Sequence, residues 1–478
     1  MDERQVAPAF DSPASRQSDA AGIFDAHHPP SRELVDDCVH CGFCLPACPT
    51  YVLWGEEMDS PRGRVYLMRM GLEGRAAFTP SFLEHFDACL GCMACVTACP
   101  SGVKYGALIE AVRPQLERHA PRSLGDRLFR RLIFLLFPYP NRLRVFTTPL
   151  RVYQRTGLQR LVRSSGFLKL LPRRIQAMES LAPPLPRASD GKLPARIPAQ
   201  GATRLRAGLL LGCVQRVFFG DVNAATARVL AAEGCEVVVP ERQGCCGALM
   251  VHAGQQAQAL AAARALVDAF DSANVDVIVT NAAGCGSTLK EYGDLLRDDP
   301  RYAARAAALA SRCRDVSEVL ADLEPRAPRH PVHLRVAYHD ACHLQHGQGI
   351  TAQPRRVLQT IPELELLEIP EGSICCGSAG IYNLVQPEPA HALGARKARH
   401  VLATGADAVA SSNPGCLLQI RAELEQAGRS LPMLHLVELL DASICGTSLG
   451  GSEDPPSLVK APRDRGQDSA HLQDRIGA

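Results

Sequence analysis

The chain has 478 residues, enough for about two to four domains, and 46% of them are hydrophobic and 21% charged, as in globular proteins. A net charge of +2 gives no reason to expect nucleic acid as a partner. The unusual number is 19 cysteines. Because residues 1–37 contain no apolar signal core, we expect a cytoplasmic chain whose cysteines stay reduced and available to metal.

Three segments are predicted to lie outside the packed domains. Residues 1–30, rich in Asp, Ser, Ala, Pro and His, are expected to form a disordered arm, and residues 446–478 a disordered tail. Residues 181–204, which begin LAPPLPRASDGK, read as a linker between domains. The fold class that remains is multidomain: a mainly helical two-cluster ferredoxin-like domain followed by a duplicated α/β cysteine-rich region.

The ferredoxin-like domain, predicted over residues 31–118, contains two runs of C-x₂-C-x₂-C-x₃-C-P. In this spacing three close thiolates hold one [4Fe–4S] cluster, and the cysteine before the proline holds the other cluster. The first cluster is predicted on Cys38, Cys41, Cys44 and Cys99. The second is predicted on Cys89, Cys92, Cys95 and Cys48. Zinc fits these runs badly, because its sites use paired C-x₂-C sets with four ligands in total.

Between the two runs lie Arg62 and Arg64, followed by an amphipathic helical stretch over residues 65–72. The two arginines either offset the negative charge of thiolate-ligated clusters, and so tune their potential, or form ordinary surface ion pairs. Two one-electron centres close together conduct electrons and do not by themselves perform catalysis.

A basic helical connector is predicted over residues 119–180. From Arg122 to Arg174 there are 13 Lys or Arg residues, one acid (Asp126) and seven aromatic residues. Such a stretch docks on a membrane surface or a partner, or it packs the ferredoxin-like domain against the rest of the chain. Nucleic acid also uses basic stretches, but a redox protein gives no reason to expect it. The apolar run over residues 132–137 is too short to span a bilayer.

The remaining chain is a tandem duplication, with copies over residues 205–325 and 326–445. VDVIVTNAAGC, ending at Cys285, aligns without a gap on ADAVASSNPGC, ending at Cys416. Each copy alternates apolar runs with helical patterns, which predicts βαβ units. Strands are expected over residues 209–211, 236–239 and 275–280 in the first copy, and over 336–338, 364–369 and 406–410 in the second.

Four cysteines in each copy follow predicted strands. They are Cys213, Cys245, Cys246 and Cys285 in the first copy, and Cys342, Cys375, Cys376 and Cys416 in the second. Ligands gather at the carboxyl ends of parallel strands, so each set is expected to converge on one pocket. A disulfide between neighbouring cysteines is a poor alternative, because their Cα atoms lie about 3.8 Å apart and an unstrained bridge needs about 4.4–6.8 Å.

Three histidines, His339, His343 and His346, flank Cys342 in the second copy only. They are expected to ligate iron or relay protons, or else to belong to a solvated polar loop. No flavin or NAD is expected on this chain. The nearest match to the dinucleotide motif G-x-G-x-x-G begins at Gly347 and lies in the Cys342 loop, not directly after a strand.

Beyond the two ferredoxin-type runs, seven further motifs make the chain resemble the glycolate oxidase iron–sulfur subunit family. They are SPRGRVYLM (60–68), PSGVKYG (100–106), VNAATARVL (222–230), GCCGAL (244–249), GCGSTLKEYG (284–293), YHDACHLQHGQGI (338–350) and CCGSAGIYN (375–383). The resemblance covers about residues 32–443. The duplicated region resembles the "CCG" cysteine-rich domains that this family shares with heterodisulfide reductases.

The resemblance implies an electron-transfer subunit of a membrane-associated complex. Separate FAD-binding subunits would oxidise glycolate to glyoxylate, and this chain would pass the electrons to a membrane acceptor such as quinone. It would then lie peripherally on the inner face of the cytoplasmic membrane. The alternatives are the equivalent subunit of a lactate or glycerol-3-phosphate dehydrogenase, and a heterodisulfide-reductase-like thiol redox protein.

One departure concerns the end of each copy. In heterodisulfide reductases each CCG copy ends in C-x-x-C, whereas here Thr288 and Gln419 stand at the position of the last cysteine. Four thiols remain in each copy. They are expected either to hold a further cluster or to form a vacant, thiol-redox pocket.

Overall fold

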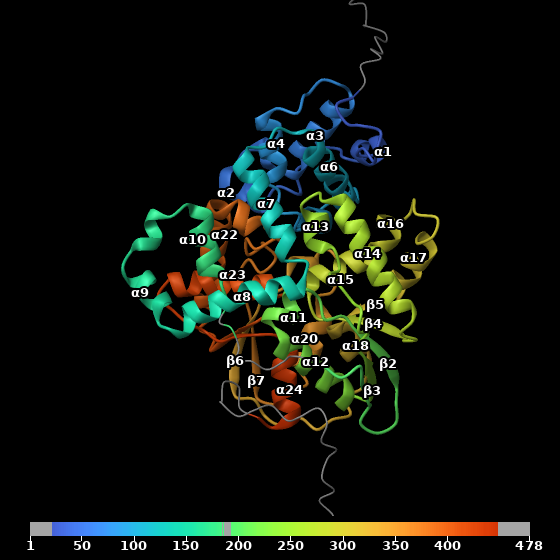
Figure 1. Ribbon diagram of the computed structural model, residues 1–478, viewed down its shortest axis with the longest axis vertical. Helices are drawn as coiled ribbons and strands as arrows, with labels where there is room; N and C mark the ends of the chain where they lie inside the picture. Colours follow the sequence, from blue (N-terminus) through green and yellow to red (C-terminus); the bar gives the residue numbers. More distant parts are fainter. Residues whose placement is uncertain (1–21, 184, 186–192, 448–478) are drawn as a thin grey trace, which may run out of the picture.

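The computed structural model describes residues 22–183, 185 and 193–447. The ferredoxin-like region caps one end of the molecule, the two α/β repeats form the other end, and the connector helices run along one flank (Figure 1). Most of the predicted arm and nearly all of the predicted tail lie outside the described residues. Within the described part of the chain, no helix is both long and apolar enough to cross a membrane.

The ferredoxin-like region is built of short helices around one apolar core. Prolines occupy the first turns of α2, α3 and α4, where the missing N–H costs nothing, and Ser60 and Thr79 cap α3 and α4. The helices are α1 (Arg32–Asp36), α2 (Pro49–Trp54), η1 (Glu57–Asp59), α3 (Pro61–Leu72), α4 (Pro80–Asp87), α5 (Ala94–Thr97) and α6 (Tyr105–His119).

The end of the predicted arm is packed against α6. The Asp25 carboxylate accepts hydrogen bonds from Gln115 Nε2 at 3.0 Å and from Arg118 Nε at 2.9 Å. The Gln115 side chain also accepts a bond from the backbone N–H of Asp25. These contacts tie residues 22–30 to the domain, whereas composition alone predicts a disordered segment up to residue 30.

The connector is helical, with α7 (Leu124–Leu136), α8 (Pro140–Arg155), α9 (Leu158–Ser164), η2 (Phe167–Leu170) and α10 (Arg173–Leu181). Its inner basic residues are ion-paired: Arg122, Arg130 and Arg174 all contact the Asp126 carboxylate. The helices α8 and α10 contact α11 of the first repeat and α21 to α23 of the second. The connector therefore packs domains together on its inner side.

Each repeat has a parallel core sheet, as the βαβ pattern predicts. The first sheet has the order β1-β3-β2-β4-β5, in which only β1 is antiparallel, and the second has the order β7-β6-β8-β9. The strands are β1 (Arg196–Ile197), β2 (Leu205–Leu209), β3 (Cys235–Val238), β4 (Val277–Thr280), β5 (Cys313–Asp315), β6 (Leu334–Tyr338), β7 (Leu364–Glu368), β8 (Ala408–Ala410) and β9 (Met433–Leu434).

All six strands expected from the sequence are present, with ends shifted by a few residues. The largest shift is in the first, because β2 covers Leu205–Leu209 and not 209–211. The three additional strands are only two or three residues long, too short to produce a periodic pattern. One of them, β1, lies inside the segment predicted as a linker and pairs with β3, so the first sheet begins before residue 205.

Helices cover both sheets. They are α11 (Val214–Phe218), α12 (Gly220–Ala232), α13 (Ala248–His252), α14 (Gln256–Asp271), α15 (Ala283–Lys290), α16 (Tyr292–Leu295), α17 (Ala303–Arg312) and α18 (Val316–Asp322) in the first repeat. In the second they are α19 (Cys342–Gln345), α20 (Ala352–Leu358), α21 (Tyr382–Val385), α22 (Pro387–Ala403), α23 (Pro414–Gln426) and α24 (Leu436–Cys445).

The two repeats share one apolar core rather than forming separate globules. The last helix of the second repeat, α24, packs on α12 of the first, and α18 of the first packs on α20 of the second. The half-buried Arg228–Asp441 ion pair joins α12 to α24. This reciprocal packing fixes the loops that carry the cysteines of both repeats relative to each other.

Candidate metal centres

The structure gathers the second predicted cluster set around one small cavity. Its lining includes Cys48, Cys89, Cys92 and Cys95, so the fourth cysteine of the first run lies with the three close cysteines of the second. All four are buried. Burial raises the pKa of the Cys92 and Cys95 thiols well above its usual value, so thiolates here need a positive charge or a metal beside them.

Arg64 is the cation that reaches this cavity. Its side chain is 1% exposed, and Nη1 lies 4.0 Å from Cys48 Sγ, while Nη2 contacts the Asp59 carboxylate at 3.2 Å. Against the effect of burial, Arg64 and Arg113 bring the pKa of Cys89 below its ordinary value. By contrast, Arg62 is partly exposed and pairs with Glu57 at 2.7 Å. Arg64 is therefore the arginine placed to offset the negative charge of thiolates at this cavity. Arg62 forms a surface ion pair, and its Nη1 also donates to the His40 carbonyl.

The first predicted cluster set lies closer to the surface. Cys41 is exposed, whereas Cys38, Cys44 and Cys99 are half-buried and all three pack against the ferredoxin-like core. Burial raises the pKa of Cys44. His40 and Gly42 adopt left-handed backbone conformations, which fold the C-x₂-C-x₂-C loop back on itself. Within the described part of the chain, no hydrogen bond joins Cys99 to the three cysteines of the loop.

The donor sets fit iron–sulfur clusters. Every one of the 19 cysteines is a free thiol, so none is diverted into a disulfide. Each ferredoxin-type set offers four soft sulfur ligands on a short loop and a helix start, which is the ligand class that holds [4Fe–4S] clusters.

The four cysteines of the first repeat also lie together. Cys245 Sγ is 3.4 Å from Cys213 Sγ, and Cys246 Sγ is 3.1 Å from Cys285 Sγ. The thiol contact with Cys245 and burial raise the pKa of Cys213 well above its ordinary value. Tyr292 supports the loop by donating its hydroxyl to the Cys246 carbonyl at 2.7 Å. This set is a compact group in which Cys213, Cys245 and Cys246 are buried and Cys285 is partly exposed.

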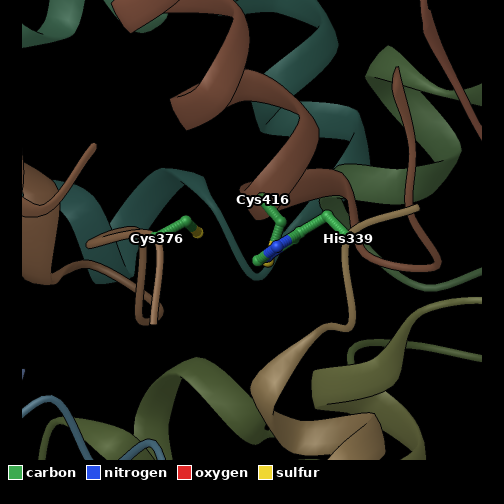
Figure 2. Close-up of side chains that lie close together, drawn as sticks. All are labelled: His339, Cys376 and Cys416. Carbon is green, nitrogen blue, oxygen red and sulfur yellow. The ribbon is translucent and has the colours of Figure 1, made fainter. Parts of the chain in front are cut away.

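The second repeat forms a similar set with histidines added. Hydrogen bonds from Cys375 and Cys416 lower the pKa of Cys376 well below its usual value, and a bond from Cys375 lowers that of Cys342. Cys342 Sγ lies 3.4 Å from Nδ1 of the next residue, His343. Figure 2 shows the His339 ring beside Cys416, with the Cys376 sulfur directed toward both, and all three ligand atoms lie within 4.8 Å of one another.

The three histidines do not behave alike. His339 and His343 are buried, at 1% and 8% exposure, so the alternative of a solvated polar loop is wrong for these two. His346 is more exposed and bridges Thr97 Oγ1 and the Ser373 carbonyl across the domain boundary. His252, which sequence patterns did not single out, packs edge-on against His343 with ring centroids 4.6 Å apart.

The Gly347 motif is part of the packing between the repeats. Gln348 Nε2 donates to the Ala283 carbonyl at 3.0 Å, and a Cβ on Gly347 would lie 2.8 Å from Ser287 Oγ. The glycine therefore permits close approach of this loop to α15. Of the cysteines without a repeat partner, Cys235 and Cys313 are fully buried in strands and Cys445 is half-buried.

The second ferredoxin-type set and the second repeat touch each other. Cys92, Cys342 and Cys375 belong to one buried cluster, together with Leu90 and Tyr382. The Cys342 thiolate also contributes to raising the pKa of Cys92, after burial itself. No solvent layer separates these two thiol sets, so charge on one is felt by the other.

A larger apolar cavity lies between the repeats and the connector. It is lined by sulfurs of both repeats, including Cys213 and Cys285 of the first and Cys342 and Cys416 of the second. The opposite wall consists of apolar side chains of α8 and α10: Leu143, Phe146, Leu150, Ile175 and Met178. Two of these wall residues, Phe146 and Ile175, are 48% and 41% exposed, so this wall is partly open to solvent.

Comparison with known protein families gives three matches. The linker region of the glycolate oxidase iron-sulfur subunit matches residues 125–182, the cysteine-rich domain matches residues 207–290 and 336–421, and the 4Fe-4S dicluster domain matches residues 34–103. The first of these covers the four connector helices and corresponds to the segment identified above by its charge.

Among curated proteins, the chain is 40% identical over 415 residues to a "Probable glycolate oxidase iron-sulfur subunit" of Bacillus subtilis, covering 84% of this chain and 93% of that protein. It is 35% identical over 412 residues to the "Glycolate oxidase iron-sulfur subunit" of Escherichia coli, with 85% and 93% covered. "Lactate utilization protein A" of Halalkalibacterium halodurans is 29% identical and matches half of this chain and 97% of its own length. The chain belongs to the family of glycolate oxidase iron–sulfur subunits.

Proposed function

We propose that this chain carries electrons away from FAD-binding partner subunits that oxidise glycolate to glyoxylate. The observation that supports it most strongly is the buried contact of Cys92 with Cys342 and Cys375, which joins the ferredoxin-type sites to the second repeat. Clusters supply one-electron transfer when bound, and this chain contributes the ligand sets in a connected order. Membership of the family supplies glycolate as the substrate of the partner subunits.

The proposed ligands of the ferredoxin-type clusters are Cys38, Cys41, Cys44 and Cys99 for the first, and Cys89, Cys92, Cys95 and Cys48 for the second. The cavity that Cys48 shares with the second run supports crossed ligation. Arg64 and Arg113 hold positive charge beside the second set, which stabilises its thiolates. The four thiols of each repeat are proposed to hold a further cluster or redox site, and their 3.1–3.4 Å contacts in the first repeat support this.

We further propose that the outer face of the connector rests on the membrane, where a quinone accepts the electrons. Most of the large apolar side chains that are exposed on the described part of the molecule lie in the connector, from Leu124 to Ile175. Arg127, Arg131 and Arg142 line a groove on the same helices. Apolar side chains beside arginines are the composition of a surface that binds anionic lipid.

The apolar cavity supports quinone as the acceptor. Its wall includes the exposed connector residues Phe146 and Ile175, and its lining includes cysteines of both repeats. A lipid-soluble carrier could therefore enter from the bilayer without crossing water. His343 also lines the cavity. Against the effect of burial, Cys342 raises the pKa of His343, so this ring holds a proton of the kind that a quinone requires when it is reduced.

The donor is tested by isolating the native complex anaerobically and adding glycolate or L-lactate while following the iron–sulfur signals by electron paramagnetic resonance. Glycolate should reduce the iron within the turnover time, and the flavin subunits should copurify with this chain. Reduction by lactate but not by glycolate would assign the chain to a lactate-oxidising complex and contradict the proposal.

The acceptor is tested by filling the cavity. Leu150→Trp should slow reduction of a soluble quinone analogue at least tenfold, because the larger side chain occupies the apolar space, while glycolate still reduces the iron. Val152→Trp is the matched control: this residue is on the same helix but 57% exposed and outside the cavity lining. Equal quinone rates in the two variants would show that the acceptor binds elsewhere.

A further inference from the structure

We propose that His339 is a nitrogen ligand of an iron centre in the second repeat, shared with Cys376 and Cys416. The proposal concerns this chain alone and does not depend on which donor reduces it. The three ligand atoms come from three different parts of the chain. His339 directly follows β6, Cys376 lies in the loop after β7, and Cys416 lies in the first turn of α23, which follows β8.

The geometry is that of a small ligand set. The ring nitrogen of His339 and the two sulfurs lie within 4.8 Å of one another. The three residues are 1%, 1% and 4% exposed, so water does not solvate them. Figure 2 shows the side chains converging from opposite sides of one space. The three atoms are therefore candidate ligands of one metal centre.

The histidine lacks another explanation. Among the residues that the structure describes, neither ring nitrogen of His339 has a nitrogen or oxygen partner, and the polar groups beside the ring are the thiols of Cys376 and Cys416. Leaving a buried polar atom unpaired costs about 1–3 kcal/mol, so such atoms normally find a partner. The buried His435 illustrates the usual case, because its Nε2 donates to the Asn281 carbonyl at 2.9 Å and its Nδ1 accepts from Val437 N–H.

Each of the two other flanking histidines has a contact at one ring nitrogen at least, and His343 Nε2 is unpaired among the described residues. His343 Nδ1 lies 3.4 Å from Cys342 Sγ and its ring packs on His252, whereas His346 contacts Thr97 and Ser373. Of the three histidines that flank Cys342, only His339 is both buried and directed at the Cys376 and Cys416 sulfurs.

In the described part of the first repeat, no histidine is grouped with the cysteines in this way. Aligning Cys213 with Cys342 puts Leu210 at the position of His339, and Leu210 packs in the apolar core behind the sheet. The two repeats therefore differ in the chemistry of their sites: sulfur only in the first, sulfur with imidazole in the second. Where histidine replaces cysteine on iron, loss of a negative ligand raises the reduction potential.

This difference gives the second repeat a role. Its Cys342 and Cys375 lie in the buried cluster that contains Cys92, so the site adjoins the ferredoxin-type region. A centre of higher potential at that place would collect electrons and hold them beside the apolar cavity. Zinc also accepts thiolate and imidazole ligands but has no redox chemistry, so iron is the metal that the position calls for.

The test uses the full-length protein, purified anaerobically, reconstituted with ferrous iron and sulfide, and labelled with ¹⁵N in its histidine rings. Pulsed electron paramagnetic resonance should detect a ¹⁵N coupling to one iron centre. His339→Ala should abolish that coupling and lower the iron content, and leave the two ferredoxin-type signals unchanged. His346→Gln, the matched control from the same loop, should retain the coupling.

A second variant protects the test against misfolding. His339→Cys restores a ligand, so it should retain the iron of this centre, lose the nitrogen coupling and shift its reduction potential downward. The proposal is overturned if the coupling survives in His339→Ala, if no centre in the wild-type protein shows nitrogen coupling, or if X-ray absorption finds only zinc bound to the second repeat.

Discussion

Replacing Arg64 by methionine should lower the reduction potential of the cluster held by Cys89, Cys92 and Cys95. Two unit charges 4 Å apart interact by about 4 kcal/mol at an effective dielectric constant of about 20. Arg64 Nη1 lies 4.0 Å from Cys48 Sγ, so this figure is an upper limit for the stabilisation of added negative charge. The electron that reduces a cluster spreads over all its atoms, which leaves about 1–2 kcal/mol.

That free energy corresponds to a fall of about 40–90 mV, since about 59 mV is equivalent to about 1.4 kcal/mol for a one-electron couple. The potential falls because the reduced cluster carries more negative charge and loses the nearby cation. Methionine keeps the length of the side chain without the charge. Potentials are measured by redox titration under electron paramagnetic resonance, with the first cluster in the same sample as an internal reference.

Two controls separate charge from damage to the fold. Arg64→Met leaves the buried Asp59 carboxylate without its guanidinium partner and with His85 Nδ1, at 3.1 Å, as the remaining side-chain contact, which is costly for stability. The double variant Arg64→Met, Asp59→Asn removes both charges and should recover part of the shift. Arg64→Lys keeps the charge and should shift the potential by less than half as much. A potential that rises in Arg64→Met, or stays within about 10 mV of wild type while both clusters are intact, would refute the electrostatic reasoning.

Three further predictions concern other parts of the chain. Cys48→Ser should damage the cluster of the second run and spare that of Cys38, and loss of only the Cys38 cluster in iron analysis and paramagnetic spectra would contradict crossed ligation. Membranes should retain the complex at low salt and release it at high salt; replacing Arg127, Arg131, Arg142 and Arg144 by glutamine should mimic high salt, whereas the same change at the exposed Arg242, Arg356, Arg399 and Arg429 should not. Burial lowers the pKa of His435 to about 4, whereas the pKa of a histidine in an unfolded chain is roughly 6.5. As the pH falls, the unfolded state therefore takes up the proton first. The stability that the neutral ring contributes is lost over the range from about pH 6.5 to about pH 4. Over that pH range the unfolding free energy of the wild-type protein should fall by up to about 3 kcal/mol more than that of His435→Gln, as measured by chemical denaturation. Parallel pH profiles of the two proteins would count against this assignment.

The experiment with the connector arginines shows how the structure changes a sequence-based design. Charge alone makes Arg130 as good a choice as Arg131, because both stand in the same basic stretch. In the fold Arg130 is 8% exposed and pairs with Asp126 at 2.9 Å, so its removal would disturb packing rather than surface charge. Arg127, by contrast, is exposed and lines the groove of the connector.

Local spacing in the sequence determined which residues act as a group. Three cysteines at intervals of three residues must lie on one loop, and an apolar run that ends shortly before a cysteine places that cysteine at the end of a strand. Both patterns depend on a few neighbouring residues, so the six expected strands, the two ferredoxin-type runs and the four-cysteine sets of the repeats could be predicted without the fold.

Contacts between residues far apart in the chain were decided by the tertiary structure alone. The sequence cannot distinguish Arg62 from Arg64, because both are arginines in one motif, and only the direction of α3 buries the second beside Cys48. It cannot distinguish His339 from His346 for the same reason. Cys92 and Cys342 are about half the chain apart in sequence but lie in one buried cluster. This contact, and the cavity between the repeats and the connector, form because separate parts of the chain pack on one another. No local sequence pattern encodes such packing.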